Sequence, residues 1–361
     1  MLQHPVELLE MNVSTRLLDL DELWELLCSG NAGPNPESHR VLNESDVTDD
    51  ELRTLLTESR ATNNDLVASG FAAKTMRDLI ETIKRLRRKG RSINGFVATT
   101  KGFARDEEPV QPLNEMAPSP LTIVSNACSS GSQALIEAVD ALEDDDCDAA
   151  VVAAGDAITS FIARGFESLL AVSETTARPF DRNRDGLTLG SARASVLLQR
   201  RGWRKKHPCV YAYGCSNDAN HISGPSRDGS GLALAIERAL DGIDRSEIRA
   251  ICAHGTATEY NDAMEARAFH TVFNSNPPPV FGIKGAIGHT LGAAGLIEVI
   301  VSALVATEGL IPPTVGFEHG EEDYPLDVVH GEPRKIKPGY VLTTNSGFGG
   351  MNTAIIVGPG R

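Results

Sequence analysis

The sequence lacks the features that mark zinc, redox-dithiol and nucleic-acid-binding proteins. Its 6 cysteines form no Cys-x-x-Cys pair, which excludes a zinc site of the usual spacing and a thioredoxin-like dithiol. The formal net charge of −15 disfavours nucleic acid as the main partner, because phosphate binding needs a basic surface. We therefore expect no metal site, no nucleic-acid partner and reduced thiols.

Signals for export and membrane insertion are also missing. No uninterrupted apolar run reaches the roughly 18 residues that suggest a membrane span. The N-terminus carries no basic stretch followed by an apolar core and a cleavage site. Apolar content is ordinary at 41%, aromatic content is low at 5%, and the 33 glycines suit an α/β protein. The sequence favours a cytoplasmic protein with no membrane span.

Predicted strands and helices alternate from residue 121 onward. Before that point we expect a helix over 19–28 that ends at Ser29-Gly30, a strand over 93–100, and no opening strand. The later strands are expected at 121–125, 149–153, 194–198, 210–212, 250–253, 341–344 and 353–357. The later helices are expected at 130–142, 232–240, 263–273 and 292–304. This alternation predicts α/β layers around a largely buried sheet.

Two segments of the sequence resemble each other. Residues 128–137 read Cys-Ser-Ser-Gly-Ser-Gln-Ala-Leu-Ile-Glu, and residues 289–298 read His-Thr-Leu-Gly-Ala-Ala-Gly-Leu-Ile-Glu. Alignment on the shared Leu-Ile-Glu places Gly131 against Gly292. Each segment follows a predicted strand and opens a predicted helix, so the match indicates a duplicated unit with a helix N-terminus in each half.

Cys128 lies between a predicted strand and a predicted helix. A helix N-terminus carries a partial positive charge and unpaired N–H groups. We expect this environment to lower the pKa of the thiol and to make Cys128 a nucleophile. Its own backbone N–H is a candidate donor to the oxyanion that forms when a thioester carbonyl is attacked.

Two histidines occur in similar surroundings. His254 follows the predicted strand at 250–253 and begins the stretch His-Gly-Thr-Ala-Thr, and His289 lies within the glycine-rich stretch 284–295. A single histidine is more often structural than catalytic. Two histidines beside glycines, together with the cysteine, indicate a shared active site. A cysteine hydrolase would use only one of them and would leave Lys284 without a role.

Motifs in a fixed order make the chain resemble a β-ketoacyl synthase of the elongating type, within the thiolase-like superfamily. They are Asn126–Gly131, Arg178–Asp181 with Asp185-Gly186, His254–Thr258, Asp262–Glu265, Lys284–Gly295 and Asn345–Gly350. The resemblance covers about residues 121–361 well and the first 120 residues poorly. Thiolases have a cysteine and initiating synthases an asparagine at the position of His289, so the histidine favours an elongating enzyme.

The resemblance implies a decarboxylative Claisen condensation that lengthens a fatty-acid or polyketide-type chain. Cys128 would hold the acyl chain as a thioester, while His254 and His289 would stabilise the enolate formed from malonyl-acyl carrier protein. In the family a lysine at the position of Lys284 pairs with an acidic residue that matches Glu265, and this pair organises the histidines. Phe348 matches the family's gatekeeping aromatic residue, and its N–H would complete the oxyanion hole with that of Cys128.

The resemblance also implies the architecture and the partners. The expected fold is the thiolase-like fold, a duplicated five-layered α-β-α-β-α arrangement, with an N-terminal half at 1–205 that carries the cysteine and a C-terminal half at 206–361 that carries both histidines. The expected partners are acyl carrier protein and a second copy or another ketosynthase-like subunit. No cofactor is expected on the enzyme, since phosphopantetheine arrives with the carrier protein.

The chain departs from the family pattern in its first third. It lacks the usual opening strand with its Thr-Gly-x-Gly turn, and the stretch from Gly102 to Cys128 is short. Arg193-Ala194-Ser195 replaces a common run of glycines, and Met351 a common threonine. An alternative therefore stays open, in which the chain is a non-catalytic or chain-length-determining partner subunit of a ketosynthase heterodimer.

Two basic clusters interrupt the acidic sequence, at 84–91 and at 200–206. They are either solvated ends of elements or local positive patches that receive an acidic carrier protein. The second interpretation predicts that charge reversal at Arg87 and Arg88, or at Lys205 and Lys206, weakens transfer from the carrier protein.

Overall fold

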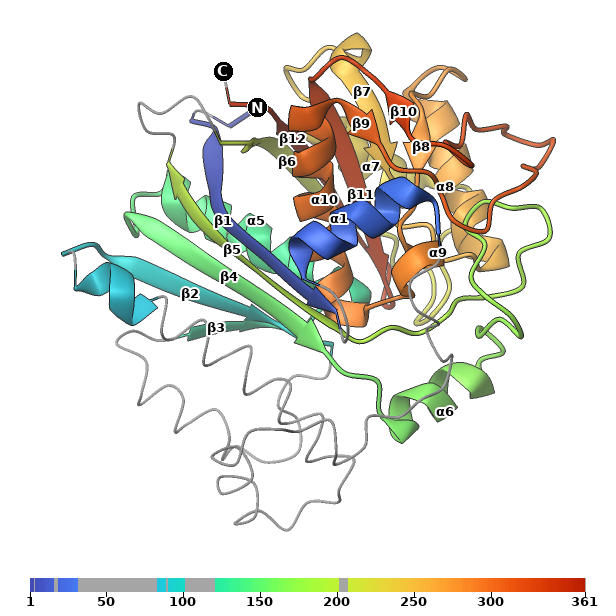
Figure 1. Ribbon diagram of the computed structural model, residues 1–361, viewed down its shortest axis with the longest axis horizontal. Coiled ribbons are helices and arrows are strands. Elements are labelled where there is room, and N and C mark those ends of the chain that lie inside the picture. Colours follow the sequence, from blue (N-terminus) through green and yellow to red (C-terminus); the bar gives the residue numbers. More distant parts are fainter. Residues whose placement is uncertain are drawn as a thin grey trace.

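The core of the protein is a ten-stranded sheet built from two similar halves (Figure 1), and β9 (Leu310–Ile311) and β10 (Arg334–Lys335) form a separate two-stranded sheet. The computed structural model describes residues 1–2, 4–15, 19–31, 83–88, 90–100, 121–200 and 207–360. The first half holds β3 (Leu121–Val124), β2 (Ile93–Ala98), β4 (Ala149–Asp156), β5 (Ala192–Arg200) and β1 (Val6–Thr15), in that spatial order. The second half holds β6 (Cys209–Asn217), β12 (Met351–Gly358), β11 (Tyr340–Gly347), β7 (Ile248–Cys252) and β8 (Val280–Phe281).

The strand directions repeat between the halves. In the first half β2 is parallel to β3 and β4, and β5 is antiparallel to β4 and β1. In the second half β7 is parallel to β8 and β11, and β12 is antiparallel to β11 and β6. The halves join where Val6 pairs with Val210 and Glu7 with Cys209. The predicted duplication is confirmed, while the predicted boundary at 205/206 lies outside the described residues.

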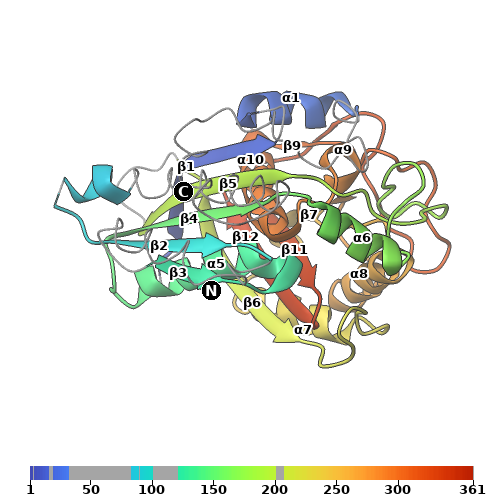
Figure 2. The same ribbon diagram turned by 90° about the horizontal axis from the view of Figure 1, so that it is seen from below.

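Helices fill the layer between the half-sheets and cover their outer faces. Alternate residues of β4 show this: Ala150, Val152 and Ala154 pack in the core with α5 (Ser130–Glu143) and α10 (Ala294–Glu308). Ala149, Val151 and Ala153 face Ile83 and Leu86 on the other side. In the second half, α7 (Ser230–Ala239) and α8 (Glu259–Val272) lie on the face of β11 opposite α10 (Figure 2). This is the predicted five-layered thiolase-like arrangement.

The residues that are equivalent in the two duplicated segments differ from those that the sequence alignment paired. A short 3-10 turn precedes each helix, at Ala127–Ser129 and at Leu291–Ala293. Ala127 has φ +49° and Leu291 has φ +54°, so these two residues are equivalent. Cys128 then corresponds to Gly292 rather than to His289, and the sequence alignment was wrong by three residues. The Leu-Ile-Glu match that set that alignment is not a structural equivalence.

The first strand, β1, was missed in the sequence analysis. It lies between β5 and β6 at the centre of the sheet. Its pairing with β5 shifts register between Leu8 and Met11, and such a bulge breaks the period-two alternation by which a strand is recognised. The expectation of no opening strand is therefore wrong. The helix α6 (Ser160–Ser168), capped by the Thr159 side chain, was also not predicted.

Other local predictions are confirmed. The helix α1 (Leu20–Ser29) begins with an Asp19–Glu22 capping box and ends at Gly30 with φ +71°, a left-handed conformation that suits glycine. The eight predicted strands and the four other predicted helices also appear within a few residues of their expected positions. The basic segment 201–206 and all of residues 32–82 lie outside the described residues.

One segment of the described chain, Leu291–Glu308, is apolar enough over 18 residues to cross a membrane by composition alone. The sequence analysis did not count it, because Glu298 interrupts the apolar run. In the fold it contains α10, and 83% of it is buried inside the protein. It is the central helix of the core.

The contact between α5 and α10 tests the fold. A Cβ added at Gly131 would lie 2.7 Å from the Gly292 oxygen and 2.9 Å from the Leu296 nitrogen. We expect Gly131→Ala to lower the free energy of unfolding by about 1–3 kcal/mol in urea titrations, because the two backbones must separate. The matched control is Gly165→Ala in α6, which has open space around it and should be neutral or slightly stabilising. Equal stability of the two variants would contradict this packing.

Candidate active site

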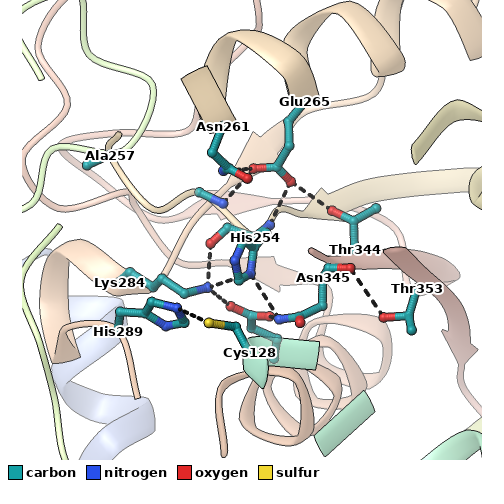
Figure 3. Close-up of polar contacts among 12 residues, drawn as sticks. Cys128, His254, Ala257, Asn261, Glu265, Lys284, His289, Thr344, Asn345 and Thr353 are labelled. Carbon is teal, nitrogen blue, oxygen red and sulfur yellow. Dashed lines mark hydrogen bonds and ion pairs between the residues drawn. The ribbon is translucent and has the colours of Figure 1, made fainter. Parts of the chain in front are cut away.

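A cavity of about 690 Å³ leads into the protein between the two halves. Its walls include Cys128, His254, His289 and Phe348, the four of the six predicted site residues that could contact a substrate directly. The volume falls in the range of small-molecule sites. Figure 3 shows the cysteine and both histidines converging from different elements.

Cys128 lies in the 3-10 turn before α5, directly after the left-handed Ala127. Its side chain is buried, and its Sγ lies 3.1 Å from Nε2 of His289. Burial raises the pKa of the thiol to about 12, only partly opposed by the nearby Lys284 ammonium. The prediction of a lowered pKa for Cys128 is therefore wrong. Desolvation outweighs the helix N-terminus, and Cys128 is a neutral thiol next to a potential base.

The surroundings of His254 keep its imidazole neutral, with the ring proton on Nε2. Its Nδ1 lies 3.2 Å from the Lys284 ammonium and 2.9 Å from Nδ2 of Asn345. Since an ammonium can only donate, Nδ1 must accept, and the ring proton belongs on Nε2. Burial, followed by the charges of Lys284 and His289, lowers the pKa of His254 well below its usual range. This leaves the Nε2–H group as the one that can serve a ligand in the cavity.

His289 forms the second wall of the site. Its ring centroid lies 5.3 Å from that of His254 and the planes are nearly perpendicular, at 86°. Its backbone N–H donates to the Thr188 oxygen at 2.6 Å, which fixes the segment between α9 (Lys284–Ile287) and the 3-10 turn at Leu291–Ala293. Burial and the Lys284 charge lower its pKa well below the usual range. His289 is thus neutral and can exchange a proton with Cys128.

The partner of Lys284 differs from the predicted one. Its ammonium contacts Glu298 of α10 and the His254 carbonyl, with both carboxylate and lysine buried. Glu265 of α8 instead accepts the N–H groups of His254 at 2.8 Å and Gly255 at 2.7 Å. The predicted direct pair of Lys284 with Glu265 is wrong. Glu265 holds the backbone of the His254 loop, and Glu298 forms the ion pair with the Lys284 ammonium.

Asn345 and Glu298 are the site residues that sequence reasoning missed. The Nδ2 group of Asn345 bridges Nδ1 of His254 and Oε2 of Glu298, each at 2.9 Å. Both residues stood inside stretches that drew attention, the repeat ending at Glu298 and the motif beginning at Asn345. Neither has reactive chemistry alone, so only the fold reveals their role.

Phe348 lies in the turn between β11 and β12 and lines the cavity. Its ring packs against Phe166 of α6, with centroids 5.8 Å apart. It is partly exposed, so its side chain stands between the cavity and the surface, as expected for a residue at the entrance.

No group of three or more potential metal ligands occurs among the described residues. The Asp181–Gly186 stretch, which looks like part of a calcium loop, has a structural use. Asp181 accepts the backbone N–H groups of Asn183, Glu318 and His319, each at 2.8 Å. These bonds lower the pKa of Asp181 despite its burial and tie the loop to the segment that contains Glu318 and His319.

The raised pKa of Cys128 predicts its reactivity. The thiolate fraction should rise about tenfold per pH unit below a pKa of about 12. We expect the rate of iodoacetamide alkylation at Cys128, followed by peptide mass mapping, to rise steadily between pH 7 and pH 9. Cys128→Ala gives the background from the other thiols. A plateau below pH 8 would mean that the thiol is already ionised and would overturn this assignment.

The buried ion pair predicts a large stability effect. Glu298→Ala leaves Lys284 buried without its carboxylate, which typically costs about 3–5 kcal/mol. We expect a loss of that size in the urea-derived free energy of unfolding. The double variant Lys284→Met/Glu298→Leu should cost less than Glu298→Ala, since no charge is stranded. A cost below about 1 kcal/mol for the single variant would show that Lys284 is solvated rather than buried.

Family models match both halves of the chain. The model described as the N-terminal domain of β-ketoacyl synthase matches residues 116–202, and that of the C-terminal domain matches 207–318. Among solved structures, the ishigamide ketosynthase/chain length factor superposes with a TM-score of 0.81 at 26% identity, covering 99% of each chain. A β-ketoacyl synthase from Burkholderia phymatum STM815 has a TM-score of 0.80 at 22% identity, covering 99% of this chain and 100% of that one, which supports the fold.

Similar sequences include the 3-oxoacyl-[acyl-carrier-protein] synthase 2 of Mycobacterium leprae, 30% identical over 82% of this chain and 74% of the relative. The oxytetracycline polyketide putative β-ketoacyl synthase 1 of Streptomyces rimosus is 36% identical over 68% of this chain. The match spans only 62% of that relative's length. With both halves matched in order, the chain belongs to the β-ketoacyl synthase family.

Proposed function

We propose that the protein catalyses a decarboxylative Claisen condensation between an acyl group on Cys128 and malonyl-acyl carrier protein. The observation that carries the proposal is the 3.1 Å contact between Sγ of Cys128 and Nε2 of His289 at a cavity that His254 also lines. One thiol with a base and one separate N–H donor are the groups that a two-stage acyl transfer requires.

In the first stage Sγ attacks the thioester carbonyl of an acyl carrier protein. The thiol proton moves to Nε2 of His289 as the new S–C bond forms, and His289 returns a proton to the departing carrier sulfur. The backbone N–H groups of Cys128 and Phe348 would hold the transient oxyanion. Proton transfer to His289 compensates for the high pKa of the thiol, because no free thiolate has to form beforehand.

In the second stage malonyl-acyl carrier protein loses carbon dioxide. The Nε2–H of His254, together with His289, stabilises the negative charge that develops on the thioester oxygen. The resulting carbanion attacks the acyl carbonyl on Cys128 and forms the new C–C bond. The S–C bond to Cys128 then breaks, and the departing thiolate takes up a proton from solvent by way of His289. Lys284 contributes by keeping Nδ1 of His254 an acceptor, so that the donor face stays toward the substrate. Lys284, Glu265 and Glu298 are thus positioning residues.

The partners follow from the reaction. Acyl carrier protein supplies both substrates, each on its own phosphopantetheine arm, and the enzyme works in the cytoplasm as a homodimer or with another ketosynthase-like chain. The six unpaired cysteines suit a reducing compartment. Charge reversal at Arg87 and Arg88 remains a test of carrier-protein binding, while Lys205 and Lys206 lie outside the described residues.

The alternative is a partner subunit that shapes the chain length made by another ketosynthase. It draws support from the similarity to the ishigamide ketosynthase/chain length factor. A partner subunit does not need its own cysteine, two histidines and a cavity that connects them. Their joint presence favours the catalytic function.

Acyl loading of Cys128 tests the proposal. Incubation with a panel of acyl carrier proteins that carry acyl groups of different length should add one acyl mass to the intact protein. The added mass should vanish in Cys128→Ala, with folding of both proteins checked by circular dichroism. The best-loaded acyl group would report the depth of the pocket. A folded wild-type protein that takes no acyl group from any carrier would favour the partner-subunit function.

A further inference from the structure

Asp156 is a buried carboxylic acid that the proposed mechanism does not use. It is the last residue of β4 and is 3% exposed. Its Oδ2 accepts the backbone N–H of Thr100 at 2.9 Å and that of Gly292 at 2.8 Å, and its Oδ1 accepts the Thr99 hydroxyl at 3.0 Å. The two threonines follow β2 in the first half, whereas Gly292 lies in the 3-10 turn before α10 in the second half. The side chain of Asp156 therefore joins the two halves of the protein.

This bridge ends close to the reacting groups on both sides. Gly292 follows His289 by three residues in the segment that leads into α10. On the other side, the carbonyl groups of the two threonines accept the hydroxyl groups of Ser130 at 3.4 Å and Ser125 at 3.3 Å. These serines flank the turn that carries Cys128. A chain of hydrogen bonds thus connects the segment of the base with the segment of the thiol.

The duplication identifies a counterpart for Asp156. The last residue of β2 pairs with Ala154 of β4, and the last residue of β7 pairs with Thr343 of β11. In each half the next residue donates its N–H to the neighbouring edge strand, β3 or β8. Asp156 and Asn345, each two residues further along, are therefore equivalent. Asn345 acts inside its own half, on His254, whereas Asp156 reaches across to the other half.

The N–H group that Asp156 binds in the second half also has a counterpart. Gly292 corresponds to Cys128, whose N–H is a donor to the oxyanion in the proposed reaction. A Cβ added at Gly292 would lie 2.6 Å from Oδ2 of Asp156, so the carboxyl group leaves no room for a side chain there. The two equivalent turns thus have different uses: the turn of Cys128 serves the substrate, and the turn of Gly292 is tied to the first half.

The bridge helps to orient His289. The segment from His289 to Gly292 is anchored at both ends, because the His289 N–H donates to the Thr188 oxygen at 2.6 Å and the Gly292 N–H donates to Asp156 at 2.8 Å. The packing of α5 against α10 brings this segment close to Cys128, and the two anchors fix its orientation there. Misplacement of a catalytic group by about 1 Å can lower a rate by about a hundredfold.

We propose that Asp156 is a positioning residue for acyl transfer, which holds the segment from His289 to Gly292 so that Nε2 of His289 stays aligned with Sγ of Cys128. This inference rests on the proposed function, in which His289 is the base for the thiol. Asp156 is not among the residues that line the cavity. It therefore acts on the reaction through the backbone of Gly292 rather than through the substrate.

The test compares two substitutions of Asp156. Asp156→Asn keeps the bridge, because the amide oxygen can accept both N–H groups while the amide NH2 donates to the Thr99 hydroxyl. Asp156→Ala removes the bridge. The matched control is Asp148→Ala: Asp148 precedes β4 and accepts the Ser92 N–H at 2.8 Å, so it ties together the opposite ends of the same two strands, β2 and β4.

Two reactions of Cys128 are measured for each protein, with folding checked by circular dichroism. Acylation by octanoyl-pantetheine, followed by intact mass, uses His289 as the base. Alkylation by iodoacetamide at alkaline pH, followed by peptide mass mapping, proceeds from the thiolate and needs no base. Burial is the main cause of the raised pKa of the Cys128 thiol, and the charge of Asp156 raises this pKa further. Loss of that charge therefore cannot slow alkylation.

We expect Asp156→Ala to slow acylation about tenfold to a hundredfold without slowing alkylation. Asp156→Asn should restore most of the lost acylation rate, and Asp148→Ala should acylate as fast as the wild type. An unchanged acylation rate in Asp156→Ala would overturn the proposal. So would an equal loss in Asp156→Asn, which would mean that the charge matters rather than the bridge, or an equal loss of both reactions, which would mean general damage to the site.

A double variant shows whether Asp156 acts through His289. In a His289→Ala background, Asp156→Ala should cause no further loss of acylation, because the group that it positions is gone. A further loss of the same size would overturn the proposal. If Asp156→Ala does not fold, Gly292→Ala breaks the bridge from the other side, since its Cβ meets Oδ2 of Asp156. It should then slow acylation and spare alkylation, and a normal acylation rate would contradict the proposal.

Hydrogen exchange separates this proposal from the proposed function, because it needs no acyl donor. Peptides that cover residues 289–296 should exchange faster in Asp156→Ala than in Asp156→Asn, as measured by mass spectrometry. If the wild type is acylated but does not condense with malonyl-acyl carrier protein, the condensation fails while the acylation rates still decide the role of Asp156. If the wild type takes no acyl group, faster exchange would still support the bridge, and unchanged exchange would overturn it.

Discussion

The close approach of α5 and α10 is the constraint on which the site depends. Glycines make it possible: a Cβ at Gly131 would meet the Gly292 oxygen, and one at Gly295 would lie 2.9 Å from the Ser132 nitrogen. The helix that begins beside Cys128 and the helix that begins beside His289 can therefore bring their first turns together. Larger residues at these points would separate the two halves and with them the thiol and the imidazole. Packing, more than any polar contact, sets the 3.1 Å distance.

Desolvation then sets the charge state of the site. Cys128, His254 and His289 are all buried, so each is held in its neutral form. The buried Lys284–Glu298 ion pair lies behind the histidines. Such a pair is weak evidence for stability, since its desolvation offsets much of its attraction. The role of the pair is to orient His254: Lys284 and Asn345 both contact Nδ1, so the ring proton is on Nε2.

Sequence alone gave the fold class, the duplication and most of the elements after residue 121, because strand and helix periods are strong there. It located Cys128, His254, His289 and Lys284 because reactive residues beside glycines stand out.

The sequence-based predictions failed where they depended on contacts between residues distant in sequence. The bulge between Leu8 and Met11 concealed β1, and the repeat was aligned three residues out of register. The carboxylate partner of Lys284 was misassigned, since Glu265 and Glu298 both approach the histidines from different helices. The predicted shift in the pKa of Cys128 had the wrong direction, because a position at a helix N-terminus does not reveal how deeply the thiol is buried.

The central position of β1 has a consequence for synthesis of the chain. The strand is made first, but its partners are β5, which ends at Arg200, and β6, which begins at Cys209. Contacts so distant in sequence form slowly, because a long loop must close before they contribute. Residues 6–15 must therefore wait, unpaired, while about two hundred further residues leave the ribosome. During that interval the unpaired N–H and C=O groups of β1 are open to pairing with another chain. The two halves of the sheet can join only when this early strand is inserted between them.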